Sequence, residues 1–389
     1  MDKYSIQKLV DAEYPPTHTF DIETLKPTKL LKERYDLMIR FAPEFFTGER
    51  FLDIGCNMGF FSFLVSPTFE DVVGIDTNKQ HIELCEELKP NQKTKFYNIS
   101  FRNFISYEDF DRVMLGNVAH HIFKEINSWA WISKLAAYSR SLVLLEGAKN
   151  TKCKDIAELI PQNLHQKYNT FMYEMGKFFD LIKITPTIKY TPDRFLMLFK
   201  KKQSSVQLAQ LPFIKEIKQC DFHIFESKLY RPFMKFFKTK RKVIAKISNR
   251  GKNDMTRIRV ASASPISNGM IAEIYDGDEW VGWLEEYTGK PHKYFENEKE
   301  LFTKLCQHQI FLSKVGYIDV DFATINFSKK KKTLFDKSQV FPIKDSDPKY
   351  FIKLLNQSFK TVDERRKMEM LAALESKNPV LIEQAFMGR

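Results

Sequence analysis

One stretch, residues 51–77, constrains the fold of this chain more than any other, and it reads FLDIGCNMGFFSFLVSPTFEDVVGIDT. Two short apolar runs, residues 50–54 and 72–75, enclose a segment of helical length, and each run ends in an acidic or glycine-rich turn. This order is typical of a βαβ unit, in which two buried parallel strands flank a helix whose N-terminus faces a ligand. The sequence therefore predicts an α/β fold around a parallel sheet.

The residues of the turn indicate the chemistry of that ligand. Gly55 and Gly59 lack a Cβ, so the backbone can approach a bound molecule closely. Asp76 ends the second strand, where a carboxylate can accept hydrogen bonds from both hydroxyls of a ribose. Asp53 lies before the first glycine and would repel a phosphate, but it suits a cationic amino-acid group. We expect a nucleoside cofactor with a cationic amino-acid part; the alternative is a glycine-containing turn of some other α/β enzyme.

The D-x-G-x-x-x-G turn formed by Asp53, Gly55 and Gly59 resembles that of class I S-adenosylmethionine-dependent methyltransferases. In that family the turn faces the methionine part of the cofactor, and the acid of the next strand holds the ribose. The resemblance implies S-adenosylmethionine as cofactor and a Rossmann-like domain whose seven-stranded sheet ends in an antiparallel hairpin. The cofactor contacts that we expect in this half are Asp53, Gly55, Cys56, Asn57, Gly59, Phe60, Asp76, Phe101 and Asn117.

A second group of candidates follows the strand predicted over residues 110–115. This strand runs into Gly116-Asn-Val-Ala-His-His-Ile122, and its carboxyl end should lie at the same crevice as the first turn. His120 and His121 are therefore expected at the reaction centre. One imidazole would act as general base toward a hydroxyl acceptor, since its pKa lies near working pH, and the other would be a hydrogen-bonded core residue.

The other elements of the first half follow from the spacing of apolar residues. Residues 1–48 should form a mostly helical lead-in with an amphipathic stretch at 28–46. In methyltransferases of this class such a segment often closes over the cofactor, which makes Tyr14 and Arg34 candidate cofactor-binding residues; a capping helix packed on the sheet is the alternative. We further predict helices over residues 79–89, 129–138 and 156–178 and strands over 94–99, 141–146, 179–190 and 194–199.

Length and cysteine usage set the organisation of the chain. Its 389 residues exceed one ordinary core, so we expect a methyltransferase domain at 1–202, a linker at 203–220 and a second domain at 221–389. Five scattered cysteines without a CxxC pair argue against a disulfide framework or a structural zinc site and suit a reducing cytoplasm. The N-terminus is too polar for a signal peptide, and no apolar run approaches the length of a membrane span.

The net charge of +12 is concentrated in basic clusters at residues 200–202, 235–242 and 329–332. Such clusters could meet nucleic acid, an anionic membrane surface or acidic partners, although most charge runs are solvated faces. No nucleic-acid motif of recognisable spacing accompanies them.

The second half resembles a protein-kinase-like α+β fold in the order of its predicted elements. Asp321 and Asn326 form a D-x-x-x-x-N loop, which in kinases supplies a base and a metal-holding amide, and Asp336 follows one hairpin later. Lys246 in VIAK occupies the place of a nucleotide-phosphate lysine. The resemblance implies Asp321 as a catalytic residue, ATP at Lys246, and Mg²⁺ at Asn326 and Asp336.

Several features of this half depart from the kinase pattern. It has no glycine-rich phosphate loop, no histidine directly ahead of the catalytic aspartate and no obvious helix glutamate, and Asp336 is followed by Lys-Ser in place of Phe-Gly. The alternative is a degenerate kinase-like module that binds a partner or polymer without phosphotransfer.

A methyltransferase domain followed by a kinase-like domain resembles the bifunctional kinase-methyltransferases that terminate the O-antigen chains of bacterial lipopolysaccharide. The motifs that carry this resemblance are LDIGCNMGFFSF, VVGID, GNVAHHI, SLVLLEGA and GYIDVDFATINF with LFD. It implies a glycan or phosphoglycan acceptor and an enzyme of the cytoplasm or of the inner face of the membrane. A phosphate acceptor would need cations such as Arg34 or Lys149, whereas a hydroxyl acceptor would need His120 or His121 as base. A nucleic-acid methyltransferase and a non-catalytic adaptor are the competing hypotheses.

Overall fold

The chain forms two compact units, which we describe separately. A computed structural model describes residues 20–21, 26–148, 170–187, 194–202, 205–210, 222–225, 243–247, 252–267, 270–286, 298–319, 326–327, 333–334, 340–346 and 362–388. The first unit comprises Met1–Phe104 and Asp109–Lys202, and the second comprises Ile105–Glu108 and Gln203–Arg389.

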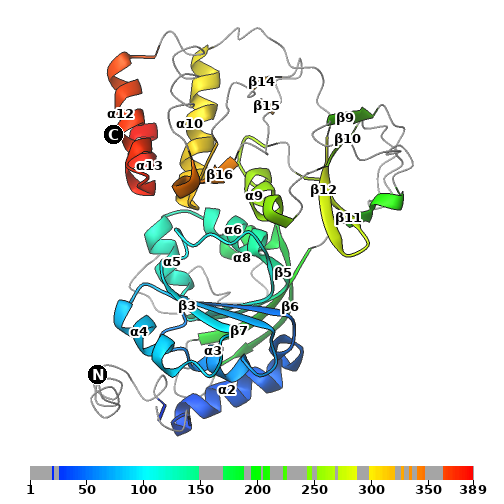
Figure 1. Ribbon diagram of the computed structural model, residues 1–389, viewed down its shortest axis with the longest axis vertical. Coiled ribbons are helices and arrows are strands. Elements are labelled where there is room, and N and C mark those ends of the chain that lie inside the picture. Colours follow the sequence, from blue (N-terminus) through cyan, green and yellow to red (C-terminus); the bar gives the residue numbers. More distant parts are fainter. Residues whose placement is uncertain are drawn as a thin grey trace. The chain divides into compact units, whose positions relative to one another are not determined.

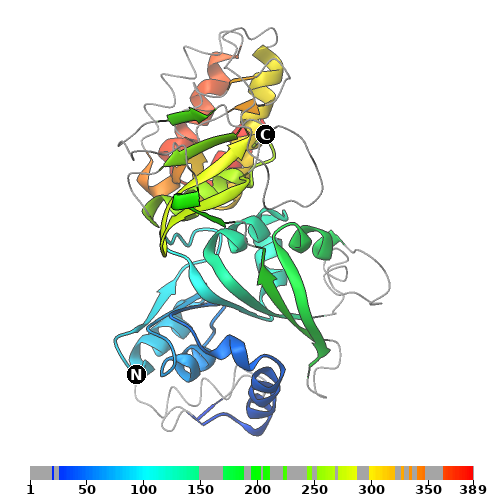
Figure 2. The same ribbon diagram turned by 90° about the vertical axis from the view of Figure 1, so that its right-hand side faces the viewer.

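A seven-stranded sheet with the order β3-β2-β1-β4-β5-β7-β6 forms the centre of the first unit (Figures 1 and 2). The pairs formed among β1 to β5 are all parallel, and β7 runs antiparallel to both β5 and β6. The predicted α/β fold and the terminal antiparallel hairpin are thus confirmed. The strands are β1 Arg50–Ile54, β2 Asp71–Asp76, β3 Thr94–Asn98, β4 Phe110–Gly116, β5 Ser139–Ala148, β6 Phe179–Pro186 and β7 Arg194–Lys201.

Helices cover both faces of this sheet, which explains why its central strands are nearly continuous apolar runs. Figure 1 shows α2, α3 and α4 on one side and α5, α6 and α8 on the other. The helices are α2 Lys29–Phe41, α3 Phe60–Val65, α4 Lys79–Leu88, α5 Ala119–Ile126, α6 Ala130–Tyr138 and α8 Thr170–Gly176. Within the helix predicted over residues 156–178, only the part from residue 170 onward lies among the described residues.

The amphipathic stretch at 28–46 forms a helix followed by a separate turn. Thr28 caps α2 by accepting a hydrogen bond from the backbone N–H of Leu31 (3.5 Å). The helix ends at Phe41 because Pro43 cannot continue it, and a 3₁₀ turn, η1 Pro43–Phe46, follows. Ahead of the helix, Phe20 and Pro27 form an antiparallel bridge. Phe20 is buried and packs on Phe60, with 5.6 Å between the ring centroids.

The second unit contains a five-stranded sheet with the order β8-β11-β12-β10-β9. Its strands are β8 Ser205–Gln207, β9 Phe222–Phe225, β10 Val243–Ile247, β11 Ala272–Asp276 and β12 Glu279–Glu286. Two short sheets follow, formed by β13 Tyr317–Asp319 with β16 Val340–Pro342 and by β14 Asn326–Phe327 with β15 Thr333–Leu334. The described helical segments are η2 Leu208–Gln210, α9 Lys252–Ser262, α10 Glu298–Lys314, η5 Ile343–Asp345, α12 Glu364–Glu375 and α13 Pro379–Met387.

The structure differs from the linker expected over residues 203–220. Its beginning is β8, which pairs in parallel with β11 as the edge strand of the second sheet. Val206 is buried there with Ile274 and Leu284. A strand of three residues with one buried side chain is too short for an apolar period to indicate it. In the described part of the chain, no helix is both long and apolar enough to cross a membrane.

Candidate functional site

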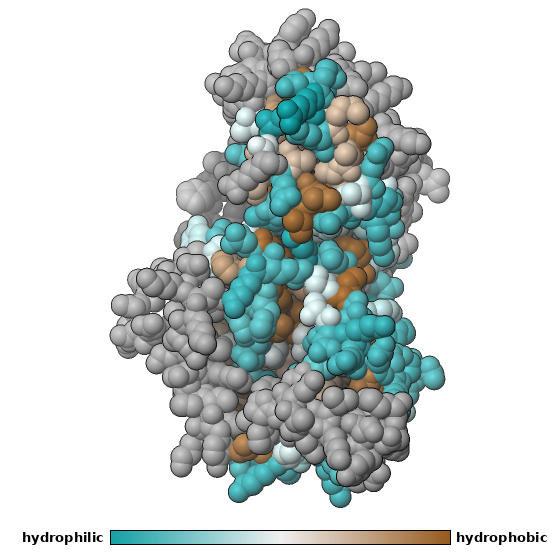
Figure 3. Space-filling model, turned by 90° about the vertical axis from the view of Figure 1, so that its left-hand side faces the viewer, coloured by the Kyte–Doolittle hydropathy of each residue, from teal (hydrophilic) through white to brown (hydrophobic). Residues whose placement is uncertain are grey.

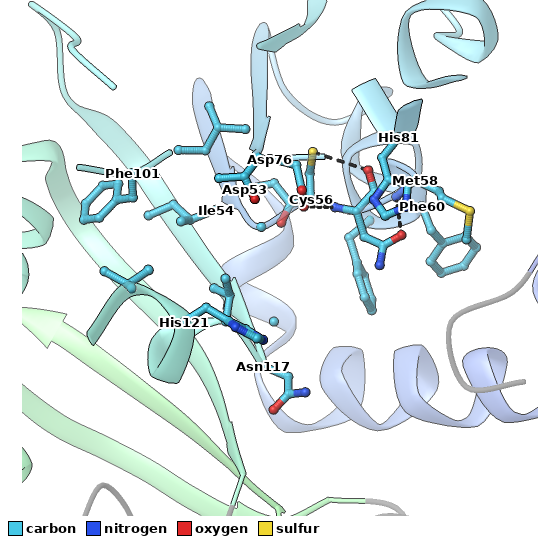
Figure 4. A pocket seen from close by; sticks show the side chains of 18 of the residues that line it. Asp53, Ile54, Cys56, Met58, Phe60, Asp76, His81, Phe101, Asn117 and His121 are labelled. Atoms are coloured by element: carbon cyan, nitrogen blue, oxygen red, sulfur yellow. Dashed lines mark hydrogen bonds between the residues drawn. The ribbon is translucent and has the colours of Figure 1, made fainter. Parts of the chain in front are cut away.

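A cavity of about 510 Å³ lies at the carboxyl ends of β1, β2 and β4, the position where open α/β sheets bind ligands. In Figure 3, hydrophobic side chains are visible in a hollow of the first unit, between hydrophilic ones. In the view of Figure 4, Phe101 lies at one end of the cavity and Met58 and Phe60 at the other. The predicted residues that line it are Arg34, Asp53, Gly55, Cys56, Asn57, Phe60, Asp76, Phe101, Asn117 and His121.

The turn between β1 and α3 needs its two glycines. Gly55 (φ 73°) and Gly59 (φ 78°) both adopt left-handed backbone conformations that favour glycine. A Cβ on Gly55 would lie 2.6 Å from a methyl carbon of Val118, and one on Gly59 would lie 2.9 Å from the sulfur of Cys85. Gly59 precedes α3 and fixes the direction of that helix without lining the cavity.

Asp53 is a buried carboxylate whose charge is poorly compensated. It is 2% exposed and accepts a hydrogen bond from the Ser62 hydroxyl (2.8 Å). Burial and the nearby charge of Asp76, opposed by the Ser62 hydrogen bond and by Arg34, raise the pKa of Asp53 from 3.8 to about 7. A cationic ligand group in the cavity would favour the ionised form.

Asp76 is held at the end of β2 by backbone donors. One of its carboxylate oxygens accepts a hydrogen bond from the N–H of Asn57 (3.0 Å), and the other accepts one from the N–H of Asn78 (2.9 Å). Each oxygen keeps lone-pair capacity for a further donor. The carboxylate is therefore fixed in place and can still receive the two hydroxyls of a ribose.

Arg34 reaches the cavity from α2 and is paired with Glu146 near the end of β5. Its Nε donates to a carboxylate oxygen of Glu146 (2.9 Å), and one of its terminal nitrogens contacts the same oxygen. Both side chains are buried, and the guanidinium lies 5.1 Å from the ring centroid of Phe61. Sequence reasoning missed Glu146; its signal was an acid directly after the apolar run SLVLL.

The two histidines on α5 occupy different positions. His121 lines the cavity, whereas His120 is not among the lining residues, and their ring centroids are 4.0 Å apart. Partial burial and the charge of Lys124 lower the pKa of His121 below 6.5, against the opposing charge of Asp76. The imidazole of His121 is therefore neutral at pH 7 and can accept a proton.

Several groups on the cavity wall lack a protein partner. Within the described residues, the Ser100 hydroxyl and the side-chain oxygen of Asn117 are buried without a hydrogen bond. Buried polar atoms of this kind require a partner, and a nucleoside or amino-acid ligand would supply one. The residues present thus fit a cofactor of that class.

The thiol of Cys56, by contrast, is unsuited to chemistry. Burial raises its pKa well above the usual value, so the nucleophilic thiolate is disfavoured.

Other residues of the cavity carry no sequence signal of their own. Met58 lies inside the turn, and the apolar period of α4 accounts for His81 as a core residue. Glu125 follows His121 by one helical turn on α5, a helix that we did not predict. The lining residues that sequence reasoning missed are Phe20, Leu31, Ile54, Met58, Phe61, Ile75, Thr77, His81, Ile99, Ser100, Gly116, Val118, Ile122 and Glu125.

The second set of predicted residues belongs to the second unit. Lys246 on β10 is buried and pairs with Glu285 on β12, with 2.8 Å between Nζ and the carboxylate. Asn326 lies in β14, opposite Leu334. Tyr14, Lys149, Asp321 and Asp336 lie outside the described residues. Among the residues that are described, no group of three histidine, cysteine or acidic side chains could hold a metal ion.

Comparison with known proteins bears on the first unit. The model of a methyltransferase domain matches residues 52–132. No curated protein matches the sequence.

Among solved structures, the N-methyltransferase NodS of Bradyrhizobium japonicum with S-adenosylhomocysteine is 14% identical, with a TM-score of 0.39 over 52% of this chain and 100% of that one. Magnesium protoporphyrin IX methyltransferase of Synechocystis with bound S-adenosylmethionine is 15% identical, with a TM-score of 0.37 over 52% and 98%. The bifunctional kinase-methyltransferase WbdD is 18% identical, with a TM-score of 0.35 over 98% and 94%.

The domain match begins in β1 and runs into α6, so it includes the glycine turn, Asp76 and the two histidines. The chain is therefore an enzyme with a methyltransferase domain, and its cofactor is S-adenosylmethionine.

Proposed function

We propose that the enzyme methylates a hydroxyl group at the end of a polysaccharide chain and that His121 is the general base. The observation that carries the proposal is the position of a neutral imidazole on the wall of the cofactor cavity. Because a hydroxyl is a weak nucleophile, it must lose its proton as the new bond to carbon forms. His121 would accept that proton at a ring nitrogen.

Different residues of the cavity have different roles in the proposed reaction. S-adenosylmethionine supplies an activated methyl group, so the protein has to align the acceptor and exclude water. Asp53 would face the cationic amino-acid end, Asp76 would hold the ribose, and Phe101 would pack beside the adenine. Arg34 would contribute its remaining N–H groups toward the cofactor, with Glu146 fixing its orientation.

The charge of the cavity favours a hydroxyl acceptor over a phosphate. Arg34 is the one lysine or arginine among its described lining residues, and Glu146 already neutralises it. Three acids, Asp53, Asp76 and Glu125, line the same cavity and would repel a phosphate. Lys149, the other cation considered for a phosphate, lies outside the described residues.

The polysaccharide acceptor rests on the resemblance of the domain order and motifs to chain-terminating kinase-methyltransferases. We propose that the kinase-like second unit binds this acceptor without phosphotransfer. In support, α9 contains no glutamate that could pair with Lys246, and Glu285 on a neighbouring strand takes that place. The acceptor would be reached from the cytoplasm, at the inner face of the membrane.

The test of this proposal is methyl transfer from labelled S-adenosylmethionine to a panel of acceptors. The panel contains polysaccharides with free hydroxyl ends, the same chains with phosphorylated ends, and RNA and DNA, each with and without ATP and Mg²⁺. We expect label on the free hydroxyl ends, independent of ATP. Label confined to phosphorylated ends would overturn the choice of acceptor group, and label on nucleic acid would overturn the acceptor class.

The role of His121 is tested by the matched variants His121→Gln and His120→Gln. The first should lower kcat by about 100-fold or more because it removes the general base, while the second should retain most activity. The rate of the wild type should fall on the acid side of pH 6.5, where His121 becomes protonated, and this limb should be absent in the residual activity of His121→Gln. Equal losses in both variants would contradict the assignment.

A further inference from the structure

The turn after β3 forms one end of the cofactor cavity. Ser100 and Phe101 line the cavity, and the N–H groups of Asn103 and Phe104 both donate to the carbonyl of Ser100 (3.0 and 2.9 Å). This turn belongs to no strand or helix, so the fold by itself leaves its position to contacts with neighbouring elements.

Two side chains of α6 hold this turn by its backbone. Lys134 donates from Nζ to the carbonyl of Arg102 (2.8 Å), and the hydroxyl of Tyr138 donates to the carbonyl of Phe104 (3.2 Å). Lys134 and Tyr138 are four residues apart and therefore lie on the same side of the helix. The Lys134 nitrogen lies 5.4 Å from the ring centroid of Phe101 and 5.5 Å from that of Tyr138.

Burying the amine of Lys134 at this position costs desolvation free energy. Its side chain is 0% exposed, and burial lowers the pKa of its amine well below the usual value. A methionine would fill a similar volume without a polar group to desolvate. The lysine provides a hydrogen bond to the turn, and its amine lies near the ring of Phe101.

We propose that Lys134, supported by Tyr138, is a positioning residue that sets the recognition of the purine base through the Ser100–Phe101 wall. The inference rests on the proposed pose of the cofactor, with its adenine beside Phe101. Lys134 is not among the residues that line the cavity: it would act by fixing the positions of the Phe101 ring and the unpartnered Ser100 hydroxyl relative to the base. Loosening the turn would therefore weaken discrimination at the base more than binding of the amino-acid end.

The experiment is calorimetry with S-adenosylhomocysteine and S-inosylhomocysteine, which differ at the 6-position of the purine. The variants are Lys134→Met, which lacks a donor, and Lys134→Gln, which keeps one; Lys93→Met is the matched control at an exposed lysine. Losing the bond to the turn should weaken S-adenosylhomocysteine binding by about tenfold in Lys134→Met. The preference for adenine over hypoxanthine should fall with it, while Lys134→Gln regains most of the preference and Lys93→Met matches the wild type.

The outcomes separate this inference from the proposed function. If the wild type bound neither ligand, the proposed cofactor site itself would fail. A wild type that binds, with a Lys134→Met variant that keeps the full adenine preference or weakens both ligands equally, would overturn the positioning role alone. Should Lys134→Met not fold, Tyr138→Phe carries the same test: a reduced adenine preference supports the role, and an unchanged preference refutes it.

Discussion

Buried charged side chains in the two units differ in how fully a partner of opposite charge balances them. In the cavity of the first unit, burial and the nearby charge of Asp76 raise the pKa of Asp53 to about 7. In the second unit, Lys246 pairs with Glu285 at 2.8 Å, and Arg259 pairs with Glu273 at 2.6 Å. An uncompensated buried charge in a cavity indicates a site that receives a charged ligand, whereas a compensated pair needs no ligand to balance it. Arg34 and Glu146 in the first unit form such a balanced pair as well. The comparison therefore singles out Asp53 as a group whose charge a ligand would balance.

The largest effect is expected from breaking a compensated pair. Lys246→Met leaves Glu285 buried without its cation and should lower the free energy of unfolding by about 3 to 5 kcal/mol. Adding Glu285→Gln removes the stranded charge and keeps an acceptor for the indole N–H of Trp283, so the double variant should regain most of the loss. Chemical denaturation of the two single variants and the double variant measures this coupling. If the single variants were as stable as the wild type, the Lys246–Glu285 pair would not stabilise the second unit, and its contrast with Asp53 would fail.

Asp53→Asn should act in the opposite direction on stability. Because the folded pKa of about 7 exceeds the unfolded value of 3.8, the ionised carboxylate destabilises the ligand-free protein as pH rises between these values. Removing the charge should stabilise the ligand-free protein at pH 8 by a few kcal/mol, with no gain at pH 4. The same change should weaken S-adenosylmethionine binding by about 10- to 100-fold, since a charged partner is lost.

Melting temperatures between pH 4 and pH 8, with calorimetry at pH 8, measure both effects. The control is Asp180→Asn on β6, where the carboxylate is 68% exposed and should change neither quantity. Cofactor binding to the wild type should also release protons near pH 7, because the cation favours the ionised form of Asp53. A variant that loses affinity and stability together would show that Asp53 has only a structural role.

A smaller effect is expected at Ser62, which donates to Asp53 from α3. Ser62→Ala removes a hydrogen bond to the charged form, so the pKa of Asp53 should rise further and cofactor affinity at pH 7 should fall by about three- to tenfold. Affinity at pH 8.5, where Asp53 ionises more fully, should recover in part. A loss of the same size at both pH values would place the effect outside the titration of Asp53.

The central part of the fold could be predicted because local signals there agree with one another. The apolar runs that became β1 and β2, the glycines between them and the acid after each run all follow from the chemistry of a βαβ unit. The end of β4 placed the two histidines near the cavity for the same reason. The sequence could not show which of His120 and His121 faces the cavity. Neighbouring residues on a helix point about 100° apart, so the choice depends on a helix that was not predicted there.

The remaining parts depend on contacts between distant segments. Glu146 meets Arg34 across 112 positions of the chain, and Lys134 meets the carbonyl of Arg102 through a turn without periodicity. Neither pairing has a local signature, and a buried lysine contradicts the usual preference of that residue for solvent. The strand β8 has three residues, which is below the length at which a period of two can be recognised.

The close packing of Gly55 against Val118 couples the position of the cofactor turn to that of α5. A single carbon added to Gly55 as a Cβ would lie 2.6 Å from a methyl carbon of Val118 and would collide with that side chain. Val118 is the residue from which α5, with His121, begins. The turn that receives the cofactor and the helix that carries the proposed base are therefore packed as one rigid piece. In evolutionary terms, position 55 has little freedom to change: a larger side chain there would collide with Val118 at the start of α5, and its left-handed backbone favours glycine even if residue 118 became smaller.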